Sequence, residues 1–153
     1  MTAGVPNRAD YSLEGSPPPS SEGARRRMRA TRQRDTPAEL AVRSALHRMG
    51  LRYRVHYPIR GVPRVRPDIV FVSARVVVFI DGCFWHSCPL HGTIPKSNRE
   101  WWMRKLQANV DRDRRHDRTL GEAGWTVIRV WEHEEPVAAA ERIAKVVRGA
   151  GES

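Results

Sequence analysis

Residues 76 to 80, VVVFI, form an unbroken apolar run that is followed at once by DGCFWHSCPLHG, residues 81 to 92. A run that is apolar on both faces predicts a central strand, covered on either side. The segment after it holds two aromatics, two cysteines and two histidines within twelve positions. This density at the end of a buried strand indicates a metal cage, a catalytic centre, or both on one loop.

The remaining apolar patterns predict further strands at residues 51–57, 67–72 and 125–133. Helical patterns occupy residues 99 to about 120 and 136–149. A first helix is predicted from Thr36 to Gly50, because TPAE forms a capping box with Thr36 at the N-cap and Glu39 at N3. The apolar spacing of that helix is set by Leu40, Leu46 and Met49. The order α, three strands, α, strand, α predicts an α/β sandwich around a mixed β-sheet flanked by helices.

The 153 residues suit a single domain. We expect residues 1–23, rich in Pro, Ser and Gly, to be a disordered leader, residues 24–35 to be a basic arm, and residues 36–153 to fold. Six arginines fall between Arg25 and Arg34 without helical or strand periodicity. They are either a solvated tail or an arm on a phosphate backbone. The arginines considered for DNA-backbone contact are Arg25, Arg26, Arg27, Arg29 and Arg32.

Lys and Arg number 27 against 17 acidic residues, a formal net charge of +10, and arginine predominates. The planar guanidinium fork suits phosphate, so this surplus favours nucleic acid as the partner over an anionic membrane. The sequence shows no apolar span of membrane length, no lipidation motif and no apolar stretch of a secretory signal. We therefore expect a soluble protein of the cytoplasm.

The two cysteines indicate zinc. Cys83, Cys88 and His91 give the spacing C-x4-C-x2-H, and tetrahedral zinc requires a fourth thiolate or imidazole, usually from a distant element. His133 is the candidate because it follows the predicted strand 125–133, with His86 as its rival. The alternative is a pair of small, buried free thiols.

Acidic residues at the ends of predicted strands indicate a second metal site, for a hard divalent cation such as Mg²⁺. Asp68 opens PDIVFV and Asp81 ends the strand that follows, so the two carboxylates are candidates to hold Mg²⁺ beside a phosphodiester. A PD-(D/E)xK nuclease has Lys two residues after the second acid, where this chain has Cys83. His86 is the candidate replacement as general base, with Asp113 as its carboxylate partner. A zinc-bound histidine and a solvated aspartate are the alternative readings of these two residues.

The aromatic pairs Phe84–Trp85 and Trp101–Trp102 lie among basic residues. Such residues are usually core, but Phe84 and Trp85 fall in a predicted loop, where large apolar groups are costly to expose without a ligand. In a DNA-binding protein they suit wedges that enter the base stack, which favours mispaired DNA because it unstacks more easily.

The segments TPAE, RPDIVF, DGCFWHSCPLHG, WWMRKLQANVDRDRR and GWTVIRVWEH, in this order, resemble the very short patch repair (Vsr) DNA mismatch endonucleases from about Met28 onward. The resemblance implies a restriction-endonuclease-like, PD-(D/E)xK-type fold in one domain. It also implies an Mg²⁺-dependent enzyme with structural Zn²⁺ that nicks one strand 5′ of the thymine in a T:G mismatch, the product of 5-methylcytosine deamination.

The resemblance also implies roles for single residues. Asp68 and the backbone carbonyl of Ile80 would hold Mg²⁺, His86 would be the general base supported by Asp113, and Glu39 would reach the metal shell through water. The implied zinc ligands are Cys83, Cys88, His91 and His133, although their spacing differs from the family pattern. The implied intercalating aromatics are Phe84, Trp85 and Trp102, and the basic segment matches a DNA-gripping arm.

Position 81 departs from the family, which has histidine where this chain has Asp81. An aspartate adds negative charge beside the scissile phosphate and can join the metal shell, so metal number or substrate range could change. The alternatives are a nuclease with relaxed mismatch range or restriction-type cutting, and a non-catalytic mismatch-DNA binding protein. A monomer on mismatched duplex DNA, associated with the nucleoid and followed by repair proteins, is the expected setting.

Overall fold

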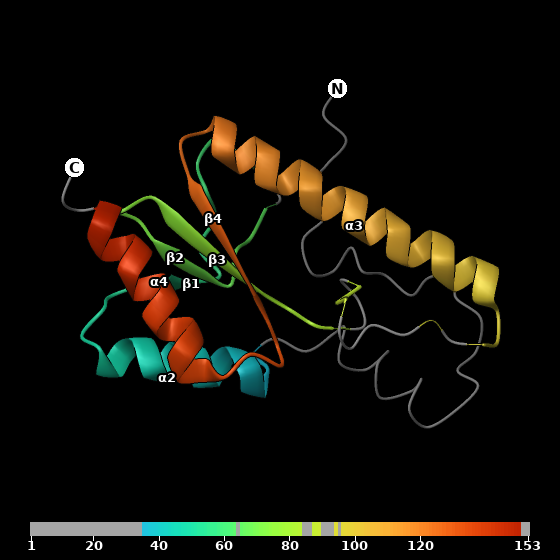
Figure 1. Cartoon of the computed structure of the whole chain (residues 1–153). Helices are drawn as coiled ribbons and strands as arrows, with labels where there is room; N and C mark the ends of the chain where they lie inside the picture. The colour runs from blue at the N-terminus through green and yellow to red at the C-terminus, as the bar shows by residue number, and fades with distance from the viewer. Residues whose placement is uncertain (1–34, 64, 84–86, 90–93, 95, 151–153) are drawn as a thin grey trace.

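The computed structural model describes residues 35–63, 65–83, 87–89, 94 and 96–150. Within these residues the element order is the predicted one, α, three strands, α, strand, α (Figure 1). The elements are α2 (Pro37–Arg48), β1 (Arg54–Val55), β2 (Ile69–Phe71), β3 (Val76–Asp81), α3 (Arg99–Glu122), β4 (Thr126–Trp131) and α4 (Pro136–Ala150). Strands β1 and β2 are shorter than the predicted 51–57 and 67–72.

The four described strands form one mixed sheet in the order β1-β2-β3-β4. β1 pairs antiparallel with β2, and β2 antiparallel with β3, with Val70 opposite Val77. β3 pairs parallel with β4, from Val76 opposite Thr126 to Asp81 opposite Trp131. The crossover between these parallel strands is α3. The expectation that residues 76–80 form a central strand is confirmed, because β3 has a partner on each side.

Helices cover both faces of the sheet, with α2 and α4 packed together on one side and α3 on the other (Figure 1). The core between the sheet and the α2–α4 pair includes Leu46, Ile69, Val78, Val130 and Ile143. The core on the opposite face consists of Ile59, Val62, Val65, Val70, Val77 and Leu120. The apolar residues of β3 therefore divide between two cores, which explains why the run has no polar position.

Helix α2 begins as the sequence predicts, because the Oγ1 of Thr36 accepts a hydrogen bond of 3.3 Å from the N–H of Glu39. Leu40 contributes to the apolar spacing that predicts this helix, but its side chain is 50% exposed. Leu40 and Leu46 are six positions apart, which is about 240° around the helix axis. The buried stripe instead carries Val42, Ala45 and Leu46.

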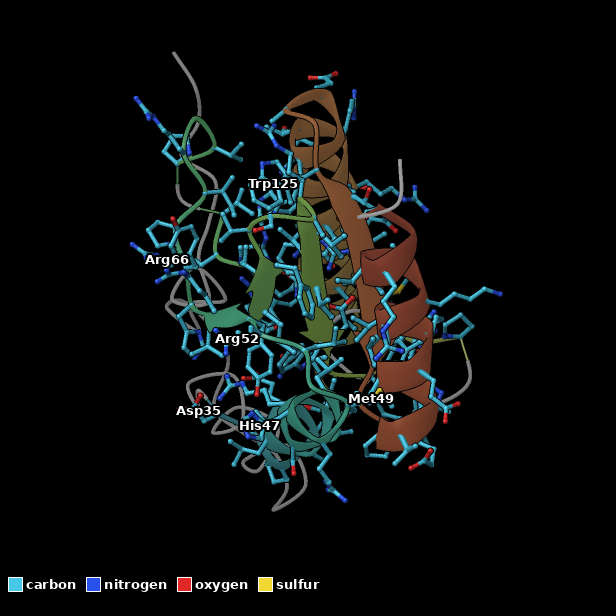
Figure 2. The ribbon with its side chains drawn as sticks, turned by 90° about the vertical axis from the view of Figure 1, so that its left-hand side faces the viewer. Asp35, His47, Met49, Arg52, Arg66 and Trp125 are labelled. Carbon is cyan, nitrogen blue, oxygen red and sulfur yellow. The ribbon has the colours of Figure 1, made fainter. Side chains whose placement is uncertain are left out.

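Helix α3 is 24 residues long and buries polar as well as apolar side chains. Its buried face comprises Trp102, Leu106, Asn109, Arg112, His116 and Leu120. Gly124, with φ +92°, makes the turn into β4. The first residue after that turn, Trp125, lies at the end of the molecule remote from Asp35, which precedes α2, and from His47 on α2 (Figure 2). Among the described helices, none combines the length and apolarity needed to cross a membrane.

The parallel pairing of β3 and β4 brings the carboxyl ends of both strands to the same edge of the sheet. The ladder continues past the strands, because the N–H of Glu132 donates to the carbonyl of Asp81 at 2.9 Å. The segment after β3 and the segment after β4 therefore meet, although about fifty residues of chain separate them in sequence. This edge carries the candidate site.

Candidate active site and metal centre

Asp68 is fixed against the end of β3. Its N–H donates to the carbonyl of Val78 at 3.0 Å, and its Oδ2 accepts a hydrogen bond of 2.7 Å from the N–H of Ile80. The residue is only 5% exposed. A carboxylate that is buried and held by the backbone is pre-organised for its task. Asp68 and Ile80, both expected at the Mg²⁺ site, are thus in direct contact.

Asp81 is the last residue of β3 and is also buried. Its two carboxylate oxygens each lie 3.1 Å from Nη1 of Arg129, a residue of β4. Position 129 pairs with position 79, two residues before Asp81 on the same face of the sheet. The carboxylate that was expected to be available to a metal is therefore ion-paired with a guanidinium.

Helix α3 places Asp113 at the same cluster, with its Oδ1 3.9 Å from Nη1 of Arg129. Its expected partner, His86, lies outside the described residues, so their contact stays a prediction. One turn further along, His116 is buried, and burial lowers its pKa to about 4. The negative charge of Asp113 opposes this pKa shift, while Arg112 and Arg129 add to it. His116 is consequently neutral at pH 7.

Glu39 is fully buried in the first turn of α2. Its Oε2 accepts a hydrogen bond of 3.2 Å from Arg43, whose other Nη lies 2.8 Å from Asp35. The Nε2 of His56 lies 3.2 Å from the same Asp35 carboxylate. The Glu39, Asp35 and His56 side chains thus converge with Arg43 among them. Glu39 both follows the N-cap of α2 and belongs to an ionic cluster, which its capping-box role alone does not explain.

Cys83, Cys88 and His133 offer ligand atoms that all lie within 4.8 Å of one another. The Nδ1 of His133 is 3.2 Å from the Sγ of Cys83 and 3.7 Å from that of Cys88. The N–H of Cys88 donates to the carbonyl of Cys83 at 2.9 Å, which holds the two cysteines close together. Two thiols and an imidazole are the donor set that zinc prefers. His91, the remaining expected ligand, lies outside the described residues.

The backbone of Cys83 is also held by a carboxylate, since its N–H donates to Oε1 of Glu132 at 3.0 Å. Burial raises the pKa of the Cys83 thiol to about 11, and Cys88 and Glu132 act in the same direction. A metal that binds here must displace this thiol proton. The Cys83 thiol therefore stays protonated until a metal cation binds and displaces the proton.

Trp102 is buried and its ring meets that of Trp101 edge to face, with centroids 4.8 Å apart. Its expected role as an intercalating residue stays a prediction. Several other expected site residues lie outside the described residues, namely Phe84, Trp85, Arg25, Arg26, Arg27, Arg29 and Arg32.

Three residues at this site were not expected from the sequence, namely Arg129, Asp117 and His116. The available signal for Arg129 was a single charge within the apolar strand WTVIRVW. Asp117 and His116 gave no such signal, because they belong to the charged run NVDRDRRHDR. Only the crossing of α3 over the sheet distinguishes them from solvated neighbours.

Comparisons with known proteins identify the relatives of this chain. The family model described as DNA mismatch endonuclease Vsr matches residues 21–90. The Type II nicking enzyme V.NaeI of Lentzea aerocolonigenes is 52% identical over 122 residues, or 78% of this chain and 73% of that protein. The Type II nicking enzyme V.XorIIP of Xanthomonas oryzae pv. oryzae is 44% identical over 117 residues, covering 75% and 83%. The DNA mismatch endonuclease Vsr of Escherichia coli is 43% identical over 107 residues, covering 69% and 66%.

The mixed sheet, its buried strand-end carboxylates and these matches define a small α/β DNA endonuclease, a hydrolase of phosphodiester bonds. The chain belongs to the Vsr family.

Proposed function

We propose that the protein nicks one strand of duplex DNA, on the 5′ side of the thymine in a T:G mismatch, and so initiates very short patch repair. The observation that carries the proposal is the buried carboxylate of Asp68 held 2.7 Å from the N–H of Ile80 at the end of a central strand. The name of the Escherichia coli relative, a DNA mismatch endonuclease, supports a mismatched substrate, and the names of the nicking enzymes support a cut in one strand.

The donor set at Asp68 fits magnesium. Mg²⁺ is usually bound through one or two carboxylates and keeps water and substrate phosphate oxygens as its other ligands. Asp68 and the carbonyl of Ile80 would hold it, and when bound it supplies a positive charge to the scissile phosphate. Glu39 would act on that metal shell through water. We also propose a restriction-endonuclease-like fold, because Asp68 lies beside the end of a central strand, where it could hold a metal.

The protein's own groups perform the proton transfer and the positioning. His86 takes the proton of the attacking water, and Asp113 on α3 holds the imidazole in the orientation this requires. Phe84, Trp85 and Trp102 enter the base stack beside the mispair. The arginine-rich arm before Asp35 binds the phosphate backbone, with Arg25, Arg26, Arg27, Arg29 and Arg32 as its contacts. The enzyme would act as a monomer on cytoplasmic, nucleoid-associated DNA and hand the nick to repair proteins.

Structural zinc is proposed for the cluster of Cys83, Cys88 and His133, with His91 as the fourth ligand. The thiol and imidazole donors fit zinc and do not fit magnesium. Such a cage would fix the loop that contains Phe84, Trp85 and His86. The zinc would thus order the catalytic loop without taking part in hydrolysis.

A nicking assay on paired duplex pools tests the proposal. Each pool has randomised flanking bases around either a central T:G or a central T:A pair, and the two strands carry different fluorophores. With Mg²⁺ we expect a cut 5′ of the thymine, in the thymine strand alone, and only in the T:G pool. Chelation by EDTA should stop it.

The same assay separates the alternatives. Equal cutting of the T:A pool contradicts mismatch specificity and supports restriction-type cutting, which Asp81 in place of the family histidine keeps open. Cutting of further mispairs supports a relaxed mismatch range. Binding of the T:G pool without cutting at any Mg²⁺ concentration supports a non-catalytic mismatch-DNA binding protein.

A further inference from the structure

Arg129 contacts carboxylates from two other elements of the fold. Besides its hydrogen bonds to Asp81 on β3, its Nε lies 2.9 Å and its Nη2 lies 2.7 Å from Oδ1 of Asp117 on α3. Its Nη2 also donates to the backbone carbonyl of Asp113 at 3.4 Å. One guanidinium therefore ties β3, β4 and α3 together at the candidate active site.

The surroundings of Arg129 fix both its charge and its orientation. The guanidinium carbon lies 4.4 Å from the centre of the Phe79 ring, a cation–π contact on the face shared with Asp81. Burial opposes its charge, but Asp81, Asp117 and Asp113 together raise the pKa of Arg129. The side chain is 21% exposed, and the Asp81 side chain is 6% exposed. Nη1 of Arg129 therefore contacts both oxygens of a buried carboxylate, and a hydrogen bond between two charged groups is stronger than one between neutral groups.

The position of Asp81 makes this pairing relevant to the metal. Asp81 follows directly after Ile80, whose N–H holds Asp68. A carboxylate before β2 and a carboxylate at the end of the neighbouring strand β3 offer a divalent cation two hard oxygen ligands. Arg129 occupies both oxygens of one of these carboxylates.

We infer that Arg129 is a positioning residue of the endonuclease, which withholds Asp81 from the divalent cation at Asp68 and holds Asp113 in place on α3. Arg129 and Asp81 thus act as a matched pair at the end of β3. The inference rests on the proposed Mg²⁺ site at Asp68. It predicts that the pair limits the metal affinity of the free protein.

Direct binding of Mn²⁺ to the DNA-free protein, followed by electron paramagnetic resonance, tests the inference. Arg129→Gln should bind Mn²⁺ about tenfold more tightly than the unaltered protein, because a nearby positive charge is lost and a carboxylate is released. Adding Asp81→Asn should reverse the gain. Adding Asp117→Asn instead should leave most of the gain in place, since the Asp117 side chain is 39% exposed, whereas Asp81 is buried and directly follows Ile80.

Controls separate this role from a purely structural one. Arg148→Gln removes an arginine on α4 that donates to the carbonyl of Met49, and it should leave Mn²⁺ affinity unchanged. If Arg129→Gln does not fold, Arg129→Lys provides the same test, because a single ammonium cannot span Asp81 and Asp117. Lysine should give a smaller gain in affinity that Asp81→Asn again reverses.

An unchanged Mn²⁺ affinity in folded Arg129 variants, or a gain that Asp81→Asn does not reverse, overturns the inference. Mn²⁺ binding to the unaltered protein that is insensitive to Asp68→Ala contradicts the proposed metal site itself, and the inference with it. If Mn²⁺ affinity depends on Asp68 but is unchanged in the Arg129 variants, the proposed function stands and only the role of Arg129 is refuted.

Discussion

The carboxylate of Asp68 and the backbone of Ile80 are joined by a hydrogen bond of 2.7 Å, donated by the N–H of Ile80. This contact links the start of β2 to the end of β3 across an antiparallel pair. It holds a buried acid at the sheet edge where the segments after β3 and β4 meet.

Replacing Asp68 by alanine should abolish nicking of T:G duplexes, because the carboxylate proposed to bind magnesium is lost. DNA binding should be largely retained, since the basic surface is unchanged. Single-turnover nicking and a fluorescence-anisotropy titration measure the two effects. Asp111→Ala is the matched control, because Asp111 is an exposed aspartate of α3 whose carboxylate accepts a hydrogen bond from Gln107. Full activity of Asp68→Ala shows that the metal is held elsewhere.

Removal of the cysteine–histidine centre should destabilise the protein. Structural zinc supplies on the order of 10 kcal/mol in apparent binding free energy. Elemental analysis should find about one zinc per chain, and His133→Ala should lower both that content and the melting temperature. His47→Ala, on the exposed side of α2, serves as the control. Less than about half an equivalent of zinc, with Cys83→Ser still folded, speaks against a structural cage.

Acidification should destabilise the protein through His116. Its pKa is about 4 in the folded protein against an ordinary value of 6.5, so the unfolded chain binds the proton more readily. This stability is fully present above about pH 6.5 and is lost as the pH falls towards about 4.

Urea unfolding at about pH 7.5 and about pH 5 measures the effect of His116. The loss of unfolding free energy on acidification should be about 1 kcal/mol smaller in His116→Gln, a value reduced from the full pKa difference to allow for solvent screening. His47→Gln should behave as the unaltered protein does. An identical pH dependence in His116→Gln excludes a neutral buried His116 as the cause.

The basic arm should determine the salt dependence of DNA binding. Replacing the six arginines between Arg25 and Arg34 by glutamine should reduce the slope of log K against log salt by about five. Anisotropy titrations over a range of salt concentrations measure this slope. Arg48→Gln and Arg148→Gln on α2 and α4 are controls for charge alone. An unchanged slope identifies the arginines as a solvated tail.

The element order was predictable because apolar periodicity is a local property of the chain. The run VVVFI required two covered faces, and β3 has them. Leu40 shows the limit of this reasoning, since a helix of twelve residues admits more than one apolar stripe. The face of α2 that becomes buried depends on where α4 packs against it. No local pattern in the sequence of α2 specifies that position.

The candidate site was partly predictable for a related reason. His133 was placed beside Cys83 and Cys88 from one assumption, that the strand before it ends at the same sheet edge. Arg129 was not predicted to belong to the site, because its contacts depend on the register of β4 against β3 and on the crossing of α3 over the sheet. Charged residues acquire a function from these long-range relationships, which a one-dimensional pattern does not contain.

During synthesis, Asp68 and both cysteines leave the ribosome long before His133, which is separated from Cys83 by fifty positions. Arg129 also arrives late, 48 positions after Asp81. At about 5–20 residues per second, the intervening segment takes several seconds to make. A half-made chain therefore has neither the contacts of Cys83 and Cys88 with His133 nor the ion pair of Asp81 with Arg129, so the candidate site is assembled only after β4 has been translated.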